Sequence, residues 1–460
     1  MSALAQQWGE SLRSATPAQG PRWLDELRLR ASDQLTAHGL PQRKDEDWKY
    51  TPMRVLEKLN PAIAYHPGSE NHFLEKGQTT ERGLNGKWFS DPIFPAALLD
   101  KPDYEIRVYD GVLVGHEGSN RPGVTVLSLT EGLQRYESLL RKHIESVDIS
   151  GSAQAFTALN TATLNQGLVI HIDQQVDAGT MLLRWALSGK AGPSIHNFRV
   201  FLLLDAGARM QLVEQFESAD HSGSALNVVV HVELGSNAVL DHLRLQNESE
   251  NTVLMSSTRI DQAQGSRYLY AGFDLGGGLV RHELKTVFGG SGAHATFLGA
   301  FVLDNARHVD NHISVDHASP GCSSEQFFRG VLGGRSRGVF NGKALIRPGA
   351  DESSVRQSSA NLLLSPLAQI DTKPELEIYA DEVEARHGAT VGQLDEAAIF
   401  YMRSRGLGEA EAKRLLVAAF CRAVTDRLEN QELAGRVSQL IDKAMPSFAE
   451  SGSENQFLKK

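Results

Sequence analysis

Residues 177–216, DAGTMLLRWALSGKAGPSIHNFRVFLLLDAGARMQLVEQF, contain the same turn twice. Asp177-Ala178-Gly179 recurs as Asp205-Ala206-Gly207, and an apolar run follows each turn. The spacing continues through later glycines, in successive steps of 28, 28, 30, 27, 29 and 28 residues, at positions 207, 235, 265, 292, 321 and 349. Ala380-Asp381-Glu382 repeats the pattern of Gly349-Ala350-Asp351-Glu352. A fixed period of this length is typical of solenoids, in which repeats stack along one axis.

The repeats have the composition of strands. Helical repeats would show apolar residues at i, i+3 and i+4, whereas this region carries short runs rich in Val, Leu, Phe and Thr, such as 198–204, 226–234 and 253–260. About 28 residues fit two strands of about six to eight residues and two turns. We therefore predict a mainly β protein with a right-handed parallel β-helix core and helical regions on both sides. The ends of a β-helix are open sheet edges, so we expect the flanking helices to cover them.

The predicted core spans residues 91–394, between an N-terminal helical region with its linker (1–90) and a C-terminal helical region (395–460). Pro21 to Gly39 has the apolar spacing of one amphipathic helix, and Thr51 could cap a second helix. Trp48 and Tyr50 either pack this region onto the core or anchor a partner. Residues 61–90 are rich in polar residues and glycine, which is typical of a linker, and carry no functional prediction.

The end of the repeat region is marked by a change of period. Leu376, Ile378, Val383 and Ala385 alternate with acidic residues, as in one strand with a buried face, and this places His387 at the rim of that strand. From Asp395 the period becomes helical, and three short helices are expected before Pro446. These helices either cap the core or bind a partner.

Composition excludes several classes of protein. The chain has 460 residues, a formal net charge of −10 and 41% hydrophobic residues, so a nucleic-acid partner is not expected. The two cysteines cannot form a disulfide framework and favour a reducing compartment. No apolar run reaches transmembrane length and no signal peptide is evident, so no membrane partner and a cytoplasmic location are expected.

Three stretches carry a family resemblance: NLLLSPLAQIDTKPELEIYADEV (361–383), HGATVG (387–392) and IFYMRSRGL (399–407). They resemble the C-terminal signature of the SufB/SufD family, the scaffolds of the SUF iron–sulfur cluster assembly machinery. The similarity extends to GVFNGKALIRPGA (338–350) and more weakly to DEDWKYTP (45–52). Gly388 after the motif histidine, and the lack of cysteine between 322 and 421, are closer to the SufD branch.

The resemblance implies a parallel β-helix scaffold without enzymatic activity or an ATP site, which pairs with a SufB homologue and recruits the ATPase SufC. It implies that His387 lies at the SufB–SufD interface, where a transient iron–sulfur cluster assembles with a SufB cysteine. It also implies that the C-terminal helices dock SufC, for which the candidates are Phe400, Arg403, Arg405 and Leu407. Many SufD-like chains have cysteine two positions before this histidine, where this chain has Ala385. Flavin binding by the complex and a homodimer of the isolated chain stay open.

Other residues also have side chains that can bind metal or act as nucleophiles. His308, His312 and His317 form the densest ligand-capable group, and they either share a metal or make hydrogen bonds within the sheet. Cys322, in a Pro-Gly-Cys-Ser turn, is the only plausible exposed thiol, whereas Cys421 is expected in a helix core. No complete phosphate-binding loop is present, since GVFNGKA (338–344) is one residue short and ends in alanine.

Two other functions fit a β-helix. One is a polysaccharide-active enzyme or adhesin, which would need a groove with clustered charged residues and usually export. The other is an interaction module that binds no metal. Glycan cleavage would support the first, and loss of ATPase binding without any effect at His387 would support the second.

Overall fold

The computed structural model describes residues 3–14, 20–64, 97–119, 121–190, 192–220 and 223–448. Most of the predicted linker, residues 65–90, and the tail beyond residue 448 lie outside the described residues.

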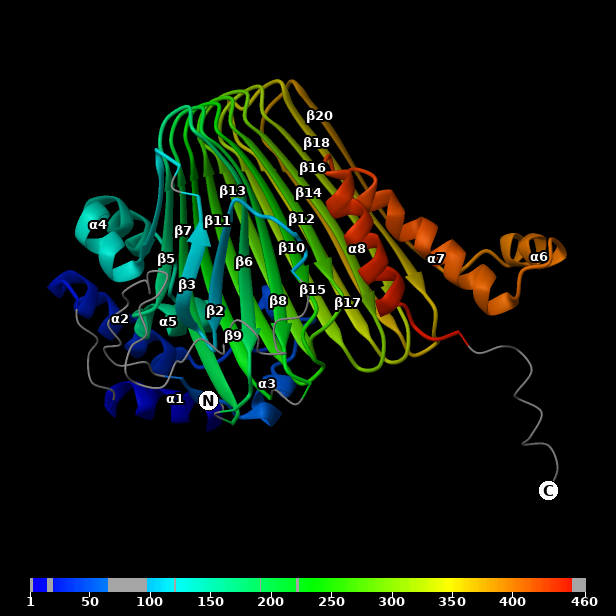
Figure 1. The fold of residues 1–460 in the computed structure, drawn as a ribbon, viewed down its shortest axis with the longest axis horizontal. Coiled ribbons are helices and arrows are strands. Elements are labelled where there is room, and N and C mark those ends of the chain that lie inside the picture. The colour runs from blue at the N-terminus through cyan, green and yellow to red at the C-terminus, as the bar shows by residue number, and fades with distance from the viewer. Residues whose placement is uncertain are drawn as a thin grey trace.

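The chain forms a flattened parallel β-solenoid whose two sheets run side by side along its length (Figure 1). The sheet that we call sheet A has the order β19-β17-β15-β13-β11-β9-β7-β5-β4, with β1 on β7; sheet B has the order β20-β18-β16-β14-β12-β10-β8-β6-β2-β3. Consecutive coils therefore add one strand to each sheet. Sheet A contains β1 (Ala62–Ile63), β4 (Val124–Ser128), β5 (Gly167–Ile172), β7 (Ser194–Leu204), β9 (Ala225–Leu234), β11 (Val253–Gln262), β13 (Leu279–Phe288), β15 (His308–His317), β17 (Arg337–Ile346) and β19 (Gln369–Ile378). Sheet B contains β2 (Tyr104–Tyr109), β3 (Val112–Gly118), β6 (Asp177–Leu187), β8 (Arg209–Ser218), β10 (Val239–Gln246), β12 (Arg267–Asp274), β14 (His294–Leu303), β16 (Ser323–Leu332), β18 (Ser353–Leu363) and β20 (Val383–Gly392).

Most of the repeated glycines mark the corners of the coils, and the predicted parallel β-helix is confirmed. Gly179 is an exception, because it lies inside β6 at a shift of register, and Gln175 (φ 60°) occupies that corner. Gly207 has φ 69° and Gly349 has φ 79°, values that favour glycine. At the corner of Gly235 the left-handed residue is Asn237 instead, with φ 58°. Most strands in the coils have eight to eleven residues, longer than the six to eight predicted. The interior is filled by side chains from both sheets, including Trp185, Phe198 and Phe297, so the coil encloses a packed core.

The N-terminal helices lie near the N-terminal end of the solenoid (Figure 1) and pack on the outer face of sheet A, rather than across the end of the stack as expected. They are α1 (Ala3–Ser14), α2 (Arg22–His38), α3 (Arg54–Leu59), α4 (Leu129–Glu145) and α5 (Ala155–Ala162). The helix predicted between Pro21 and Gly39 is confirmed as α2. Trp48 is buried and stacks on Phe156 at 5.6 Å, which agrees with the packing interpretation. Helices α4 and α5 also interrupt the range 91–394, where only strands were expected.

The prediction that Thr51 caps the second helix is wrong. Met53 precedes α3, and the Thr51 hydroxyl donates a hydrogen bond to the Asp310 carboxylate on β15. A hydrogen bond to an ionised carboxylate is stronger than one between neutral groups, and this contact joins the N-terminal region to sheet A.

The C-terminal helices are α6 (Glu396–Ser404), α7 (Glu409–Thr425) and α8 (Gln431–Ala444). The Asp395 side chain accepts a hydrogen bond from the Ala397 N–H, which confirms it as the cap of α6. Helices α7 and α8 bury Val417, Cys421 and Val424 against the outer face of sheet B. They do not cover the end of the solenoid, contrary to the expectation, and α6 projects away from the sheets (Figure 1).

Candidate functional site

The C-terminal coil of the solenoid forms an open end. Strands β19 and β20 are the last strands of sheets A and B, and within the described residues no strand pairs with their outer edges. Most residues of β20 from Arg386 to Gly392 are exposed. Unpaired strand edges present rows of N–H and C=O groups that can pair with another chain.

His387 lies in the middle of β20, so its predicted position at a strand rim is wrong. The alternation that suggested one strand belongs to two, because the chain turns at Tyr379–Glu382 between β19 and β20. The Asp351 carboxylate of the preceding coil accepts the Asp381 N–H at 3.3 Å and helps to form this corner. His387 is exposed and Gly388 continues the strand.

The register of sheet B sets the direction of the His387 side chain. His387 pairs with Gln357, and Gln357 pairs with Gln326 of the preceding coil. Gln357 and Gln326 are buried inside the coil. Because neighbours in register point to the same face of a sheet, His387 continues this interior row at its open mouth.

The backbone of His387 faces the open edge. Ser354 donates its N–H to the carbonyl of Cys322, the residue before β16, so the even residues of β18 bond to β16 and the odd residues face β20. Through the register, the odd residues of β20, including Ala385, His387 and Ala389, direct their N–H and C=O groups outward.

The edge of β19 is open in the same way, with one interruption. Gln369 and Tyr379 both donate their N–H groups to the β17 side, so the even residues between them face outward. Pro374 is one of these residues, and proline has no N–H to donate. The outer edge of sheet A therefore lacks one donor near its centre.

The structure does not bring His308, His312 and His317 together as a metal site. His308 and His312 share the outer face of β15, where His308 contacts the Thr51 hydroxyl at 3.2 Å and His312 Nε2 contacts Asp310 at 2.9 Å. His317 points to the interior, with its ring 4.7 Å from that of Phe288. Burial lowers the pKa of both His308 and His317 to about 4, so both are neutral at pH 7.

Neither cysteine is an exposed thiol. Cys322 is fully buried, contrary to the prediction, and its Sγ donates to the Gly290 carbonyl at 3.4 Å. Small residues such as Ala208, Ala293 and Ala350 occupy the same buried place after other corner glycines. Cys421 is buried in the α7 core, as expected, and burial raises its pKa to about 12.

The four proposed docking residues lie on or beside α6. Phe400 is 72% exposed, Arg403 and Arg405 are exposed, and Leu407 is half-buried. Tyr401, which the sequence interpretation did not select, is 59% exposed and lies under Arg405 at 5.3 Å. The sequence contains one signal for Tyr401, because it directly follows Phe400. Adjacent side chains of a helix point in different directions, so two adjacent aromatic rings cannot both face the same core.

Comparison with known proteins identifies the family. Residues 187–420 match the model described as "SUF system FeS cluster assembly, SufBD core domain". This chain belongs to the SufBD family. The matched SufBD range contains β7 to β20 and reaches into α7, so it includes the open end and His387.

Several relatives match this SufBD chain over nearly its whole length. The iron-sulfur cluster assembly protein SufD of Escherichia coli is 28% identical over 96% of this chain and 97% of its own. A SufBD family protein of Synechocystis is 26% identical, over 90% of this chain and 89% of its own. Protein ABCI7, chloroplastic, of Arabidopsis thaliana is 25% identical, over 94% and 87%. The sequence resemblance is thus confirmed, and the family belongs to SUF iron–sulfur cluster assembly.

No helix among the described residues is long and apolar enough to cross a membrane.

Proposed function

We propose that this chain is a non-catalytic, SufD-like scaffold subunit that pairs with a SufB homologue and recruits the SufC ATPase. The observation that carries the proposal is the open coil at β19 and β20, with the His387 imidazole inside its mouth and the His387 backbone on its edge. A partner strand added there would lie directly beside His387.

The two open edges support pairing with another solenoid. Sheets A and B end at the same coil, so a partner with matching edges could extend both sheets at once. Pro374 leaves a gap in the donor row of β19, which disfavours pairing with partners that need that donor. A second copy of this chain would bring two such gaps to the interface, so we favour a related but different partner.

The cluster, as cargo of the complex, would take its thiolates from the partner. Iron–sulfur clusters are held mainly by cysteine thiolates. Ala385 occupies the position two residues before His387, and both cysteines of the chain are buried with raised pKa values. This chain would thus supply one imidazole nitrogen, a suitable ligand for iron, and the partner would supply sulfur.

The ATPase would bind at α6 and the start of α7. Phe400 and Tyr401 expose adjacent aromatic rings on a helix that projects from the body, and Arg403 and Arg405 flank them. Aromatic and arginine side chains are the residue types that most often dominate interface energies. Arg403 also pairs with Glu409 at 3.2 Å, a contact between α6 and the first turn of α7.

The test of the cluster site is the variant His387→Ala, co-expressed with SufB and SufC homologues. We expect normal complex assembly by size-exclusion chromatography and a loss of iron and acid-labile sulfide in the isolated complex. Arg386→Ala is the matched control, because it lies on the same strand but points to the opposite face. Wild-type iron and sulfide in the His387→Ala complex would remove this histidine from the site.

The test of the docking helix is the double variant Phe400→Ser with Tyr401→Ser. We expect it to lose co-purification with the ATPase while it still binds the SufB homologue. Leu29→Ser is the control, since Leu29 is 66% exposed at the other end of the molecule. If ATPase binding is lost in the double variant and His387→Ala has no effect, the chain is a metal-free interaction module.

A further inference from the structure

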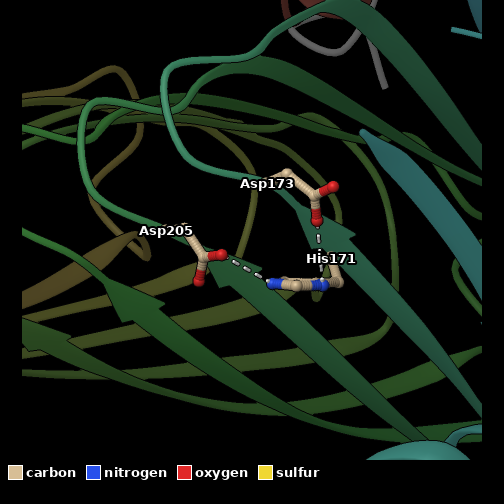
Figure 2. Close-up of side chains that lie close together, drawn as sticks. All are labelled: His171, Asp173 and Asp205. Atoms are coloured by element: carbon tan, nitrogen blue, oxygen red, sulfur yellow. Dashed lines mark ion pairs between the residues drawn. The ribbon is translucent and has the colours of Figure 1, made fainter. Parts of the chain in front are cut away.

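A second group of ligand-capable side chains lies at a corner near the N-terminal end of the solenoid (Figure 2). His171 belongs to β5, Asp173 follows β5 and Asp205 follows β7. One ligand atom from each residue lies within 4.8 Å of the other two. No other group of three or more histidine, cysteine or acidic residues within the described part of the chain is as close.

The backbone holds the two aspartates side by side. Ile172 pairs with Leu204 in the sheet, so the residues that follow them, Asp173 and Asp205, emerge at the same level. The Asp205 N–H donates to the Ile172 carbonyl at 3.0 Å, and the Asp173 N–H donates to the Gly123 carbonyl at 2.8 Å. Their positions are therefore fixed by the sheet while their side chains can turn.

The imidazole of His171 lies between the two carboxylates. Its Nε2 is 3.2 Å from Asp205 Oδ2, and its Nδ1 is 3.6 Å from Asp173 Oδ1 (Figure 2). Its Nδ1 is also 3.0 Å from the Tyr136 hydroxyl of α4, at a residue where α4 departs from helical geometry. If Nδ1 donates its proton to Tyr136, Nε2 presents its lone pair beside Asp205. Histidine ligands are commonly oriented by such a hydrogen bond from the other nitrogen.

The charge of this corner favours a cation. Within the described residues, neither Asp173 nor Asp205 forms an ion pair with lysine or arginine, and His171 is their shared partner. Their side chains are 57% and 50% exposed, so both can move by rotation. Two carboxylates beside one imidazole carry an excess negative charge that a divalent ion would neutralise.

A cavity of about 240 Å³ adjoins this corner between α4 and the ends of β7 and β9. Asp205 lines it, and so do Gln174, Leu139 and Glu233. The His143 imidazole, whose Nε2 lies 2.7 Å from Glu233 Oε2, keeps the pKa of Glu233 below its usual value, so Glu233 is ionised. The cavity has room for the water molecules that complete the coordination of a bound ion.

We propose that His171, Asp173 and Asp205 bind one divalent first-row transition metal ion, with Zn²⁺ as the representative. For any three atoms within 4.8 Å of one another, a point lies about 2.8 Å or less from all three, whereas zinc bonds to nitrogen and oxygen are about 2.0–2.2 Å long. Asp205 already lies beside Nε2, whereas Asp173 lies beside Nδ1, so the exposed Asp173 side chain rotates towards Nε2 to complete the site. Imidazole selects zinc, iron or nickel over magnesium and calcium, which prefer oxygen ligands. This site is separate from the open end and does not depend on the function proposed for it.

The experiment is isothermal titration calorimetry, in which Zn²⁺ is added to the chelator-treated full chain. A second titration with Mg²⁺ serves as the comparison. We expect one Zn²⁺ per chain and no saturable binding of Mg²⁺ in the same range. Asp205→Asn and His171→Gln should abolish this binding. Tyr136→Phe should weaken it by about 10- to 100-fold while the stoichiometry stays at one, because it removes only the hydrogen bond that orients the ligand.

The control is His294→Gln, which removes an imidazole from the outer face of β14 and should leave zinc binding unchanged. His294 contacts Ser323 and Thr296 and has no carboxylate partner among the described residues. Should His171→Gln fail to fold, Asp173→Asn tests the same site at a half-exposed side chain. Absence of zinc binding in the wild-type chain, or unchanged binding in the Asp205 and Asp173 variants, would overturn the proposal.

Discussion

A buried carboxylate joins the N-terminal region to the outer face of sheet A, and its removal gives a sharp test of what holds the two together. Asp310 on β15 is fully buried and forms an ion pair with Arg281 of β13, which is also buried. Asp310 accepts one hydrogen bond from the Thr51 hydroxyl, and its Oδ1 lies 2.9 Å from His312 Nε2. The Arg281 guanidinium lies 4.0 Å from the ring centre of Trp48. Asp310→Asn therefore leaves a buried guanidinium without its counter-ion.

Loss of one member of a buried ion pair costs about 3–5 kcal/mol. At about 2.1 cal/mol/K of unfolding entropy per residue, the 460 residues give about 1 kcal/mol/K, so the melting temperature should fall by about 3–5 °C. Differential scanning calorimetry at pH 7 measures this shift, and hydrogen exchange should show the first loss of protection around residues 48–51. The matched control is Asp316→Asn on the same strand, whose partner Arg347 is exposed, and it should change stability little.

The double variant Asp310→Asn with Arg281→Met distinguishes the loss of the ion pair from the cost of leaving one buried charge without a partner. A neutral pair of similar volume avoids the uncompensated charge, so the double variant should be more stable than Asp310→Asn alone. The reasoning is refuted if Asp310→Asn shifts the melting temperature no more than Asp316→Asn, or if the two substitutions are additive.

The same carboxylate predicts a pH dependence. Burial alone would raise the pKa of Asp310, but the charges of Arg281 and His312 lower it below its usual value. Because the unfolded pKa of aspartate is about 3.9, the stabilisation is fully present above that pH and is lost as the pH falls towards the folded-state pKa. Asp310→Asn should flatten this part of the stability profile.

Three further outcomes follow from buried or edge positions. Burial lowers the pKa of His317 to about 4, so the unfolded chain binds more protons than the folded chain between pH 6.5 and 4. The free energy of unfolding should therefore fall by up to about 3 kcal/mol as the pH is lowered across that range. Urea unfolding measures this decrease, which should be smaller in His317→Gln. Cys322 and Cys421 should resist alkylation in the native chain and react fully in denaturant, and rapid native labelling would contradict their burial. Pro374→Val restores a donor to the open edge of β19, so sedimentation velocity should detect more self-association; an unchanged monomer fraction would show that this proline does not protect the edge.

The repeat could be predicted from the sequence because the coil corner needs a left-handed residue, and glycine supplies it at most corners. Gly207 and Gly349 mark two of them with positive φ. The small residue after each glycine was also visible in the sequence, and it explains why Cys322 is buried where a turn suggested exposure. The burial of Cys322 could not be predicted from the sequence, because only the stacked coils show that the residue after the glycine points inward.

The corner at Tyr379–Glu382 contains no glycine or proline, and its one signal in the sequence is the repeat of Ala350-Asp351-Glu352 in Ala380-Asp381-Glu382. The preceding coil imposes it, through the hydrogen bond from Asp381 to Asp351 and the pairing of β20 with β18. Local alternation therefore suggested one strand where tertiary pairing makes two. The group of His171, Asp173 and Asp205 was missed for a similar reason, because its members come from different coils and no short motif joins them.

The two ends of the solenoid differ in a way that favours a partner at one of them. At the N-terminal end, β3 pairs antiparallel to β2 and β4 antiparallel to β5, so the parallel stack cannot continue there. At the other end the last strands remain parallel and open, although three helices follow them directly in the chain. If the task of these helices were to cap the stack, α7 would lie across β20. Helix α7 packs instead on the outer face of sheet B through Val417 and Val424, and it leaves the edge of β20 unpaired. An exposed edge risks aggregation unless another strand occupies it, so this arrangement supports the proposal of a partner strand beside His387.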